Sequence, residues 1–382
     1  MTWKQLVPSK EIGQRIKIVQ KKMLRAGLNA ALIVQRVDLF YLTGTAQNAY
    51  LYIPAEGSPL LMVKKYYPRA TQESAIAQIV QLKSVKNLPN MIVDHYGELP
   101  KNLGLEMDVL PYREFHFLKS LFPQQDLKDI SPLILEARAI KSDWEIEQLK
   151  NAAIRSEKCF GPAIEHACTR KHPVKIASTV QTRARILGHG AKIRMRYHRE
   201  RAIPFTIKFW PSVNSETPEL HNARLVEMDF KWVFNGYHLH ETRLLRLWNL
   251  SPAITKAAQN LLQIHDHVIQ EARPGVTAQE LYMKAQTKAI ALGYPNALVG
   301  LDPRNRPSPT APIGHGIGLE LREPPFITKA NQTVLTPNMV LAIHPALMLG
   351  RELAISMCSV MRITTNGSEY ISKVSNKVFE AL

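Results

Sequence analysis

Residues 235–243 read NGYHLHETR, a polar stretch at the junction of two strand-like runs, ARLVEMDFKWVF (223–234) and GYHLHETRLLRL (236–247). The second run places His238 and His240 two residues apart, with Glu241 beside them. Side chains two residues apart on a strand lie on the same face of a sheet. The two histidines are therefore either ligands for chemistry or the polar face of a strand, and the rest of the chain decides between these interpretations.

Around this stretch, helical patterns alternate with further strand-like runs. The S/T-x-x-E patterns at Ser142–Glu145 and Thr277–Glu280 are capping boxes that each begin a helix, and Ser251–Pro252 opens another. NMVLAIHPALML (338–349) and SVMRITT (359–365) read as additional strands. Helices mixed with mostly antiparallel strands predict an α+β C-terminal domain over residues 137–382.

The first 136 residues have a different pattern. Apolar residues at helical spacing predict a helix from Ser9 to about Ala26, with Gly27 closing it. NAALIVQRVDLFYLTG (29–44) and YLYIPAEGSPLLMV (50–63) read as strands, with a turn at residues 56–59. The continued alternation predicts an α/β N-terminal domain over residues 1–136.

Composition narrows the class of protein. A chain of 382 residues can form two domains, and its 45% hydrophobic and 21% charged residues are ordinary for a globular protein. The sequence contains neither an apolar run long enough for a membrane span nor a secretory apolar core near its start, so we expect a cytoplasmic protein without a membrane partner. Three cysteines are too few for a disulfide framework.

The formal net charge of +17 raises the expectation of an anionic partner or substrate. The densest basic stretch is AKIRMRYHRER (191–201), whose arginines include Arg201. It is either the solvated face of a strand or an anion-binding wall. Specific nucleic-acid binding is not expected, because no zinc-finger, KH or RRM signature is present.

Four segments, in this order, resemble one known superfamily. They are DLFYLTG (38–44), ARAIKSDWEIEQLKNAA (137–153), EARPGVTAQEL (271–281) and PIGHGIGLELREPP (312–325). They are similar to motifs of the creatinase, aminopeptidase P, prolidase and methionine aminopeptidase superfamily, the M24 metallopeptidases. This resemblance implies a pita-bread C-terminal domain preceded by a creatinase-type α/β domain. It also implies a homodimer.

Active members of that superfamily hold two divalent metal ions with two aspartates, one histidine and two glutamates. Position by position, the resemblance keeps the first aspartate as Asp229 and the histidine as His315. The second aspartate has become His240, the first glutamate has become His344, and the second glutamate has become Cys358. Three of the five ligand positions have therefore changed.

These changes argue against a dinuclear centre. A neutral imidazole has one lone pair and cannot bridge two metals. Asp229 with a Cys358 thiolate would also leave two divalent ions under-neutralised in a partly dry cleft. We therefore expect one divalent transition metal on His240, His315 and His344, with Cys358 and Asp229 as further ligands or Asp229 as general base. Zinc suits these donors first, and iron, nickel or copper also suit them.

Other candidate residues surround this set. In the position of the family's H-E-x-P motif stand Arg322 and Glu323. Arg322 either grips a substrate carboxylate or forms an internal ion pair, and Glu323 is a candidate catalytic residue. His221 matches a substrate-loop histidine of the family and is a further catalytic candidate. His238 and Arg201 are candidates for contact with substrate.

Three function classes stay open. The first is a hydrolase of C–N bonds with one metal, acting on a small or short-peptide substrate that is anionic. Standard proline-specific aminopeptidase activity is not expected, because both bridging carboxylates are gone. The second is a metal-free, creatinase-like amidinohydrolase with histidine as acid and base. The third is a non-catalytic binding module for an anionic partner. Bound metal separates the first class from the others.

Two further histidines lie two residues apart in a helical pattern. His265 and His267 fall within the helix that begins near Ser251, and we expect both to lie on a surface or half-buried helix face. Cys159 and Cys168 belong to an earlier helix and are expected to be packing residues.

Overall fold

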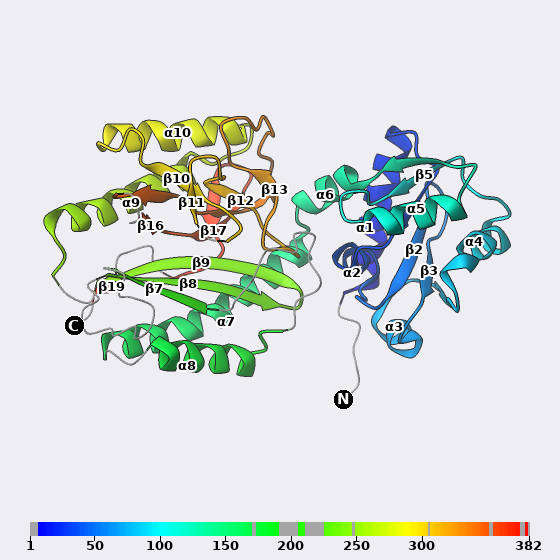
Figure 1. The fold of residues 1–382 in the computed structure, drawn as a ribbon, viewed down its shortest axis with the longest axis horizontal. Helices are drawn as coiled ribbons and strands as arrows, with labels where there is room; N and C mark the ends of the chain where they lie inside the picture. The colour runs from blue at the N-terminus through cyan, green and yellow to red at the C-terminus, as the bar shows by residue number, and fades with distance from the viewer. Residues whose placement is uncertain are drawn as a thin grey trace. The chain divides into compact units, whose positions relative to one another are not determined.

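A computed structural model describes residues 7–169, 173–190, 205–210, 225–246, 249–304, 306–350, 354–374 and 379–380. The chain divides into two compact units, one ending at Arg138 and the other beginning at Ala139 (Figure 1). The basic stretch 191–201, with its expected strand, lies outside the described residues, as does His221.

The N-terminal unit is built on one six-stranded mixed sheet. Its strands are β1 (Ala30–Ile33), β2 (Ala49–Pro54), β3 (Leu60–Val63), β4 (Gln78–Gln81), β5 (Asn102–Leu105) and β6 (Asp126–Asp129), in the order β4-β3-β2-β1-β5-β6. Its helices are α1 (Ser9–Arg25), α2 (Arg36–Thr43), α3 (Tyr67–Glu73), η1 (Val85–Asn87), α4 (Leu88–Tyr96), α5 (Tyr112–Leu121) and α6 (Ser131–Ala139). The α/β prediction is confirmed.

One element of this unit differs from the prediction. Residues 29–44 were expected to be strand throughout, but only Ala30–Ile33 is a strand, and Arg36–Thr43 forms helix α2. The Gln35 side chain accepts from the backbone N–H of Val37 and caps this helix, and Gly44 ends it with a φ of +79°. The apolar and aromatic residues of α2 are nearly all buried, so tertiary packing outweighs their strand preference.

The C-terminal unit combines four helices with three sheets in its described part. The helices are α7 (Asp143–Cys168), α8 (Pro173–Ile186), α9 (Pro252–Glu271) and α10 (Ala278–Ala291). The sheet orders are β19-β9-β8-β7, β13-β12-β14-β17-β18 and β11-β10-β15-β16. Their strands are β7 (Phe205–Trp210), β8 (Leu225–Phe234), β9 (Tyr237–Arg246), β10 (Leu298–Leu301), β11 (Pro307–Ser308), β12 (Gly314–Gly316), β13 (Glu323–Phe326), β14 (Val340–Ile343), β15 (Ala346–Met348), β16 (Ala354–Ser356), β17 (Ser359–Ile363), β18 (Ser368–Tyr370) and β19 (Phe379–Glu380).

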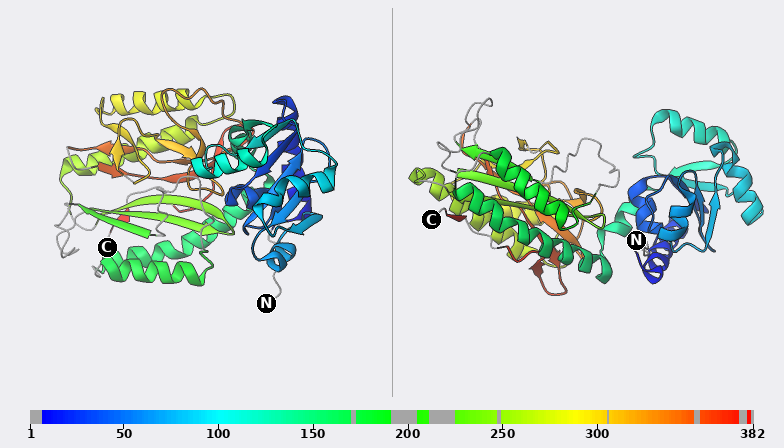
Figure 2. Two further views of the ribbon diagram at one scale, coloured as in Figure 1. Left: turned by 45° about the vertical axis from the view of Figure 1, so that its right-hand side comes forward. Right: turned by 90° about the horizontal axis from the view of Figure 1, so that it is seen from below.

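The layers of this unit leave one face of the β8–β9 hairpin turned toward the other sheets. Helix α7 lies along the opposite face of that hairpin, α8 packs on α7 and β7, and α9 packs on β14, β15 and β16 (Figures 1 and 2). The pairings are antiparallel except between β19 and β9. The α+β prediction is therefore confirmed.

The predicted helix starts are confirmed in detail. Ser142 and Glu145 form both arms of a capping box at α7, and Thr277 and Glu280 do the same at α10. The prediction for His265 was wrong, because this residue of α9 is fully buried. It shares a helix face with Leu261 and Val268, four residues before and three residues after it, and both are core residues.

The hairpin register decides which side chains meet. Asn235 and Gly236 form its turn with φ values of +50° and +84°, a conformation that suits a two-residue hairpin. The pairing places Asp229 opposite Thr242 and Lys231 opposite His240. These four side chains share one face of the hairpin, because directly opposed residues point the same way.

The other face of the hairpin packs on α7. The ring of Phe230 lies 4.1 Å from that of Phe160, measured between centroids, and Ser156 donates to Glu241 over 2.7 Å. Glu241 therefore belongs to the helix-facing side. The histidines beside it in the sequence face the other sheets.

Candidate metal centre

Three strands of the C-terminal unit bring the candidate residues to the inner face of the hairpin. Thr242 and Cys358 exchange backbone hydrogen bonds of 3.1 and 3.2 Å, which fixes Cys358 next to β9. His344 directly follows β14, and its backbone N–H donates to Ile313 over 2.7 Å. His315 lies in β12, paired with β14.

His240, His344 and Cys358 form a compact donor cluster. One potential ligand atom from each of these residues lies within 4.8 Å of the others. All three side chains are buried, and the rings of His240 and His344 meet edge to face with centroids 4.7 Å apart. His315 lies outside this cluster, with its ring centroid 6.4 Å from that of His240.

Asp229 is held by three side chains of the hairpin. The Lys231 ammonium lies 2.6 Å from Oδ2. His240 Nε2 lies 2.7 Å from Oδ1, and the Thr242 hydroxyl donates to the same oxygen over 3.0 Å. Both carboxylate oxygens therefore accept hydrogen bonds from protein groups.

These contacts determine which ring nitrogens keep a lone pair. An ionised carboxylate only accepts, so His240 carries its proton on Nε2 and presents Nδ1 as an acceptor. His315 Nδ1 donates to the carbonyl of Gly316 over 2.9 Å, which leaves Nε2 as its acceptor. Neither acceptor nitrogen has a hydrogen-bond partner among the described residues, and both are buried.

A second carboxylate reaches His344 through a serine. The Ser356 backbone N–H and hydroxyl both donate to Glu227 over 2.8 Å. Because the hydroxyl proton is directed at Glu227, the serine oxygen accepts from His344 Nε2, 3.2 Å away. This arrangement leaves Nδ1 of His344 with a lone pair.

Burial and the lysine set the charges of the centre. Burial alone would raise the pKa of Asp229, but the positive charge of Lys231 and the hydrogen bond from His240 bring it well below its usual range. Burial lowers the pKa of His240. It also lowers those of His315, with a contribution from Arg322, and of His344, with a contribution from His240. The three imidazoles are therefore neutral at neutral pH, the protonation state that binds metal.

The donor set fits one transition metal. Two neutral imidazoles and a thiol are the ligand types of zinc and of related borderline metals, and the buried acceptor Nδ1 of His240 lacks any other partner among the described residues. A carboxylate that orients a histidine through its second ring nitrogen is the usual partner of a metal-binding histidine. Asp229 stands in that relation to His240.

Glu323 and Arg322 are engaged by the protein itself. Glu323 forms a buried ion pair with Lys141 at 3.0 Å and accepts from the backbone N–H of Glu320 over 2.9 Å. Arg322 donates to the carbonyls of Leu301 and Asp302, over 3.0 and 2.9 Å. The expected roles of Glu323 in catalysis and of Arg322 in substrate binding stay predictions.

His238 lies on the same strand face as His240, two residues earlier. It is buried, and its Nδ1 lies 3.3 Å from the carbonyl of Gly318. His221 and Arg201, the remaining candidates, lie outside the described residues.

Sequence reasoning missed Lys231, Glu227 and Ser356. The first two carried a usable signal, because they lie two residues after and two residues before Asp229 on a strand and must share its face. Ser356 carried no such signal. Its contact with His344, 12 residues earlier, depends on the pairing of β15 with β16, and β16 was not among the strands expected from the sequence.

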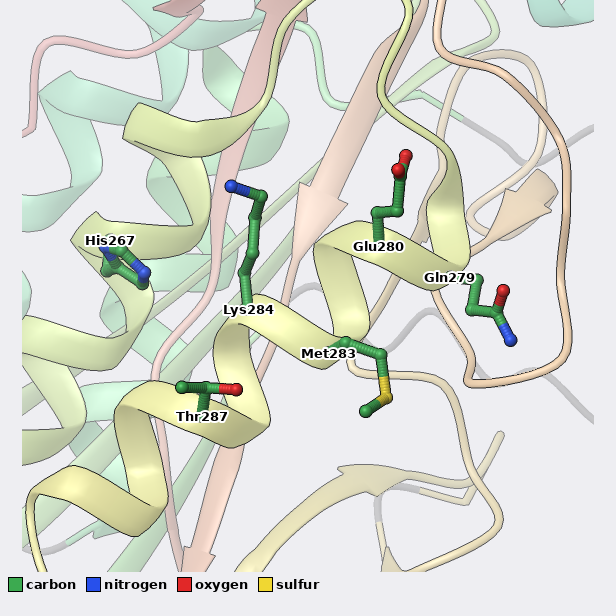
Figure 3. Close-up of a pocket in the computed structure, with 6 residues that line it drawn as sticks. All are labelled: His267, Gln279, Glu280, Met283, Lys284 and Thr287. Carbon is green, nitrogen blue, oxygen red and sulfur yellow. The ribbon is translucent and has the colours of Figure 1, made fainter.

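A surface pocket is lined by residues of α9 and α10, and not by residues of the donor cluster. Its lining consists of His267, Gln279, Glu280, Met283, Lys284 and Thr287 (Figure 3). Two of these already have structural partners, because Glu280 caps α10 and Lys284 pairs with Glu271. The lining includes no member of the donor cluster.

Comparison with known families agrees with this two-unit architecture. Residues 15–140 match the creatinase/prolidase N-terminal domain, and residues 147–365 match metallopeptidase family M24. The chain belongs to metallopeptidase family M24. The resemblance noted in the sequence and the pita-bread fold that it implies are thus confirmed.

Relatives and solved structures span nearly the whole M24 chain. A Xaa-Pro dipeptidase of Pyrococcus horikoshii is 24% identical over 374 residues, covering 96% of this chain and 99% of the relative. The crystal structure of the prolidase from that organism superposes with a TM-score of 0.81 at 24% identity, over 96% of this chain and 100% of the other. A Xaa-Pro dipeptidase structure from Bacillus anthracis gives 0.81 at 19% identity, over 97% and 99%.

No helix in the described part of the chain is both long enough and apolar enough to cross a bilayer.

Proposed function

We propose that this M24 chain is a hydrolase of C–N bonds that uses one divalent transition metal held by His240, His344 and Cys358. The observation that carries the proposal is the convergence of these three buried donors within 4.8 Å. The engagement of Asp229 by Lys231, His240 and Thr242 supports a single metal. Zinc is the first candidate, with iron, nickel and copper as the others.

The metal would supply Lewis-acid polarisation of the scissile carbonyl or activation of water. Asp229 orients the His240 ring through Nε2 and so leaves the lone pair of Nδ1 for a metal. Glu227 acts on His344 in the same way through Ser356. Three protein ligands leave a position for substrate or water, as catalytic sites require.

His315 is assigned to proton transfer in this proposal. Its Nε2 is a buried acceptor without a hydrogen-bond partner in the described residues, and its Nδ1–H is fixed on the carbonyl of Gly316. A neutral, oriented imidazole can take a proton from water and return it to the leaving amine. The proposal moves His315 from the ligand set expected from sequence to this role.

The substrate is proposed to be small and to carry an acidic group. Arg322 lies close enough to contribute to the lowered pKa of His315, and the chain carries a formal net charge of +17. Relatives described as Xaa-Pro dipeptidases act on a peptide that ends in a carboxylate. A dipeptide or a similar small amide meets both conditions.

The test is metal-dependent hydrolysis of a small panel. Protein freed of metal by a chelator is reloaded with one equivalent of zinc, iron, nickel or copper. It is then assayed on Xaa-Pro dipeptides, their C-terminal amides and non-proline dipeptides. We expect hydrolysis only after reloading, with weaker activity on the amides, and loss of activity and bound metal in His344→Ala.

The matched control is His267→Ala, which removes a half-buried histidine of α9 that is not part of the donor cluster. This variant should keep both metal and activity. Equal hydrolysis by chelated and reloaded protein would refute the metal-dependent proposal and favour the metal-free class. A protein that holds one metal yet hydrolyses no member of the panel would refute the hydrolase assignment.

A further inference from the structure

We propose that Lys231 is the built-in cation of this centre, and that its ammonium group occupies the position at Asp229 where a second metal ion would otherwise bind. The inference deepens the proposed function, because it explains why the centre takes one exchangeable metal. Lys231 would act as a positioning residue. It neutralises Asp229, and Asp229 in turn orients His240.

The geometry comes directly from the hairpin register. Lys231 lies two residues after Asp229 on β8 and directly opposite His240 on β9, so all three side chains share one face. The ammonium lies 2.6 Å from Asp229 Oδ2, and the two side chains are only 10% and 1% exposed. A buried charge is strongly unfavourable without such a partner.

The other carboxylate oxygen of Asp229, Oδ1, contacts side chains of β9. Oδ1 accepts from His240 Nε2 and from the Thr242 hydroxyl, over 2.7 and 3.0 Å. The carboxylate therefore has a cation on one oxygen and the ligand histidine on the other. Lysine fixes the carboxylate, and the carboxylate fixes the tautomer and direction of the imidazole.

Charge excludes a second ion while Lys231 is present. A divalent ion at Oδ2 would lie within a few Å of a positive ammonium, where repulsion in a low dielectric is large. The neighbouring ligands His240 and His344 add no compensating negative charge, because an imidazole ligand is neutral. The Lys231 ammonium and a second metal ion at Asp229 therefore exclude each other.

The test is to remove the ammonium and count metals. Wild type, Lys231→Ala, Lys231→Arg and Lys231→Ala/Asp229→Asn are stripped with chelator, titrated with Mn²⁺ and separately with Zn²⁺, and measured for bound metal and Tm. We expect Lys231→Ala to bind one metal more than wild type. Its Tm should be lower in chelator and rise when metal is added.

The double variant is the matched control. Asn keeps a carbonyl oxygen that can accept from His240 but removes the negative charge, so Lys231→Ala/Asp229→Asn should lose the additional metal and its effect on Tm. Lys231→Arg keeps the cation and should match wild type. An unchanged metal count in Lys231→Ala would overturn the inference.

If Lys231→Ala does not fold, the pairing of Lys231 with Asp229 is tested by removing the two charges in turn and measuring Tm. Lys231→Met should have a lower Tm than wild type, and Asp229→Asn in the same chain should restore it, because a buried pair can be replaced by neutral groups but not halved. Absence of rescue would overturn the inference. If wild type binds no metal, the proposed function is contradicted. The role of Lys231 would still be supported in that case if Lys231→Ala binds a metal that is lost when Asp229 is also changed to Asn.

Discussion

Cys358 is the member of the donor cluster whose protonation state a metal would change. Burial, and then the nearby Asp229 carboxylate, raises the pKa of the Cys358 thiol well above its usual value. Without metal it is a neutral thiol whose Sγ lies 3.4 Å from the carbonyl of His240. Metal binding through sulfur must therefore release this proton, which makes metal affinity increase with pH.

We predict that Cys358→Ala lowers metal affinity by at least ~10-fold, because even partners outside the ligand set typically contribute that much. Competition with a chromophoric chelator measures the change. Cys159→Ala is the control, since Cys159 is also a buried cysteine, with a pKa raised by burial to about 11, but belongs to α7 and not to the cluster. Equal affinities in both variants would remove Cys358 from the ligand set.

At this scale the sequence could identify residue types better than their partners. The motif positions led to His240, His344 and Cys358, which the structure brings together. The sequence alone could not show that Glu323 forms an ion pair, because its partner Lys141 lies 182 residues away in the chain. Such a contact exists only after the chain has folded.

Among the elements, the β8–β9 hairpin contributes His240 together with Asp229, Lys231 and Thr242. Its two central turn residues, Asn235 and Gly236, both have positive φ. This geometry follows the twist of the strands and sets the register that pairs Lys231 with His240. A shift of one residue would move every donor on β9 to the helix-facing side.

We predict that Gly236→Ala destabilises the chain by about 1–2 kcal/mol, the strain of a Cβ in the left-handed region. Urea unfolding measures this loss. Asn235→Gly at the neighbouring position should stay within about 0.5 kcal/mol of wild type, because glycine adopts positive φ readily. If both variants were equally stable, the turn would not control the register as described.

Most elements of the structure follow the sequence pattern, but packing overrides the pattern in one helix. Strands β8, β9, β14 and β17 follow runs recognisable in the sequence, and both capping boxes formed as expected. Helix α2 was missed because all of its residues except Arg36 are buried, so no exposed polar face reveals a helical period. Only the cap at Gln35 and the left-handed Gly44 indicate a helix there.

For the whole molecule, buried histidines make stability depend on pH. Burial lowers the pKa of His265 in α9 below its ordinary value of 6.5. Between these two values the unfolded chain binds more protons than the folded chain, so acid favours unfolding. The stability is complete above about pH 6.5 and declines as pH falls below it, by up to about 1.4 kcal/mol per pH unit for each such histidine.

We therefore predict that His265→Leu flattens the decline in unfolding free energy between pH 6 and pH 5. Urea titrations of wild type and variant at pH 8, 6 and 5, in chelator, measure it. At pH 8 His265 is neutral in both the folded and the unfolded chain. Its protonation therefore contributes nothing to the difference in unfolding free energy between the two proteins at that pH. An unchanged slope in acid would show that His265 is not among the groups that protonate on unfolding.

The overall fold was the most predictable level, because four motifs in a fixed order carry it and the family match covers residues 15–140 and 147–365. The substrate was the least predictable. Two of the residues expected to contact it, His221 and Arg201, lie outside the described residues. Arg322 is engaged by backbone carbonyls in a way that its sequence position does not indicate.

The most direct test of this account is the number of metal ions per chain. Untagged protein is purified without added metal, dialysed against a mild chelator and measured by plasma mass spectrometry, before and after reconstitution with zinc, iron, nickel or copper. The account predicts one tightly held transition metal per chain. Two ions per chain would contradict the role of Lys231, and none after reconstitution would contradict the centre formed by His240, His344 and Cys358.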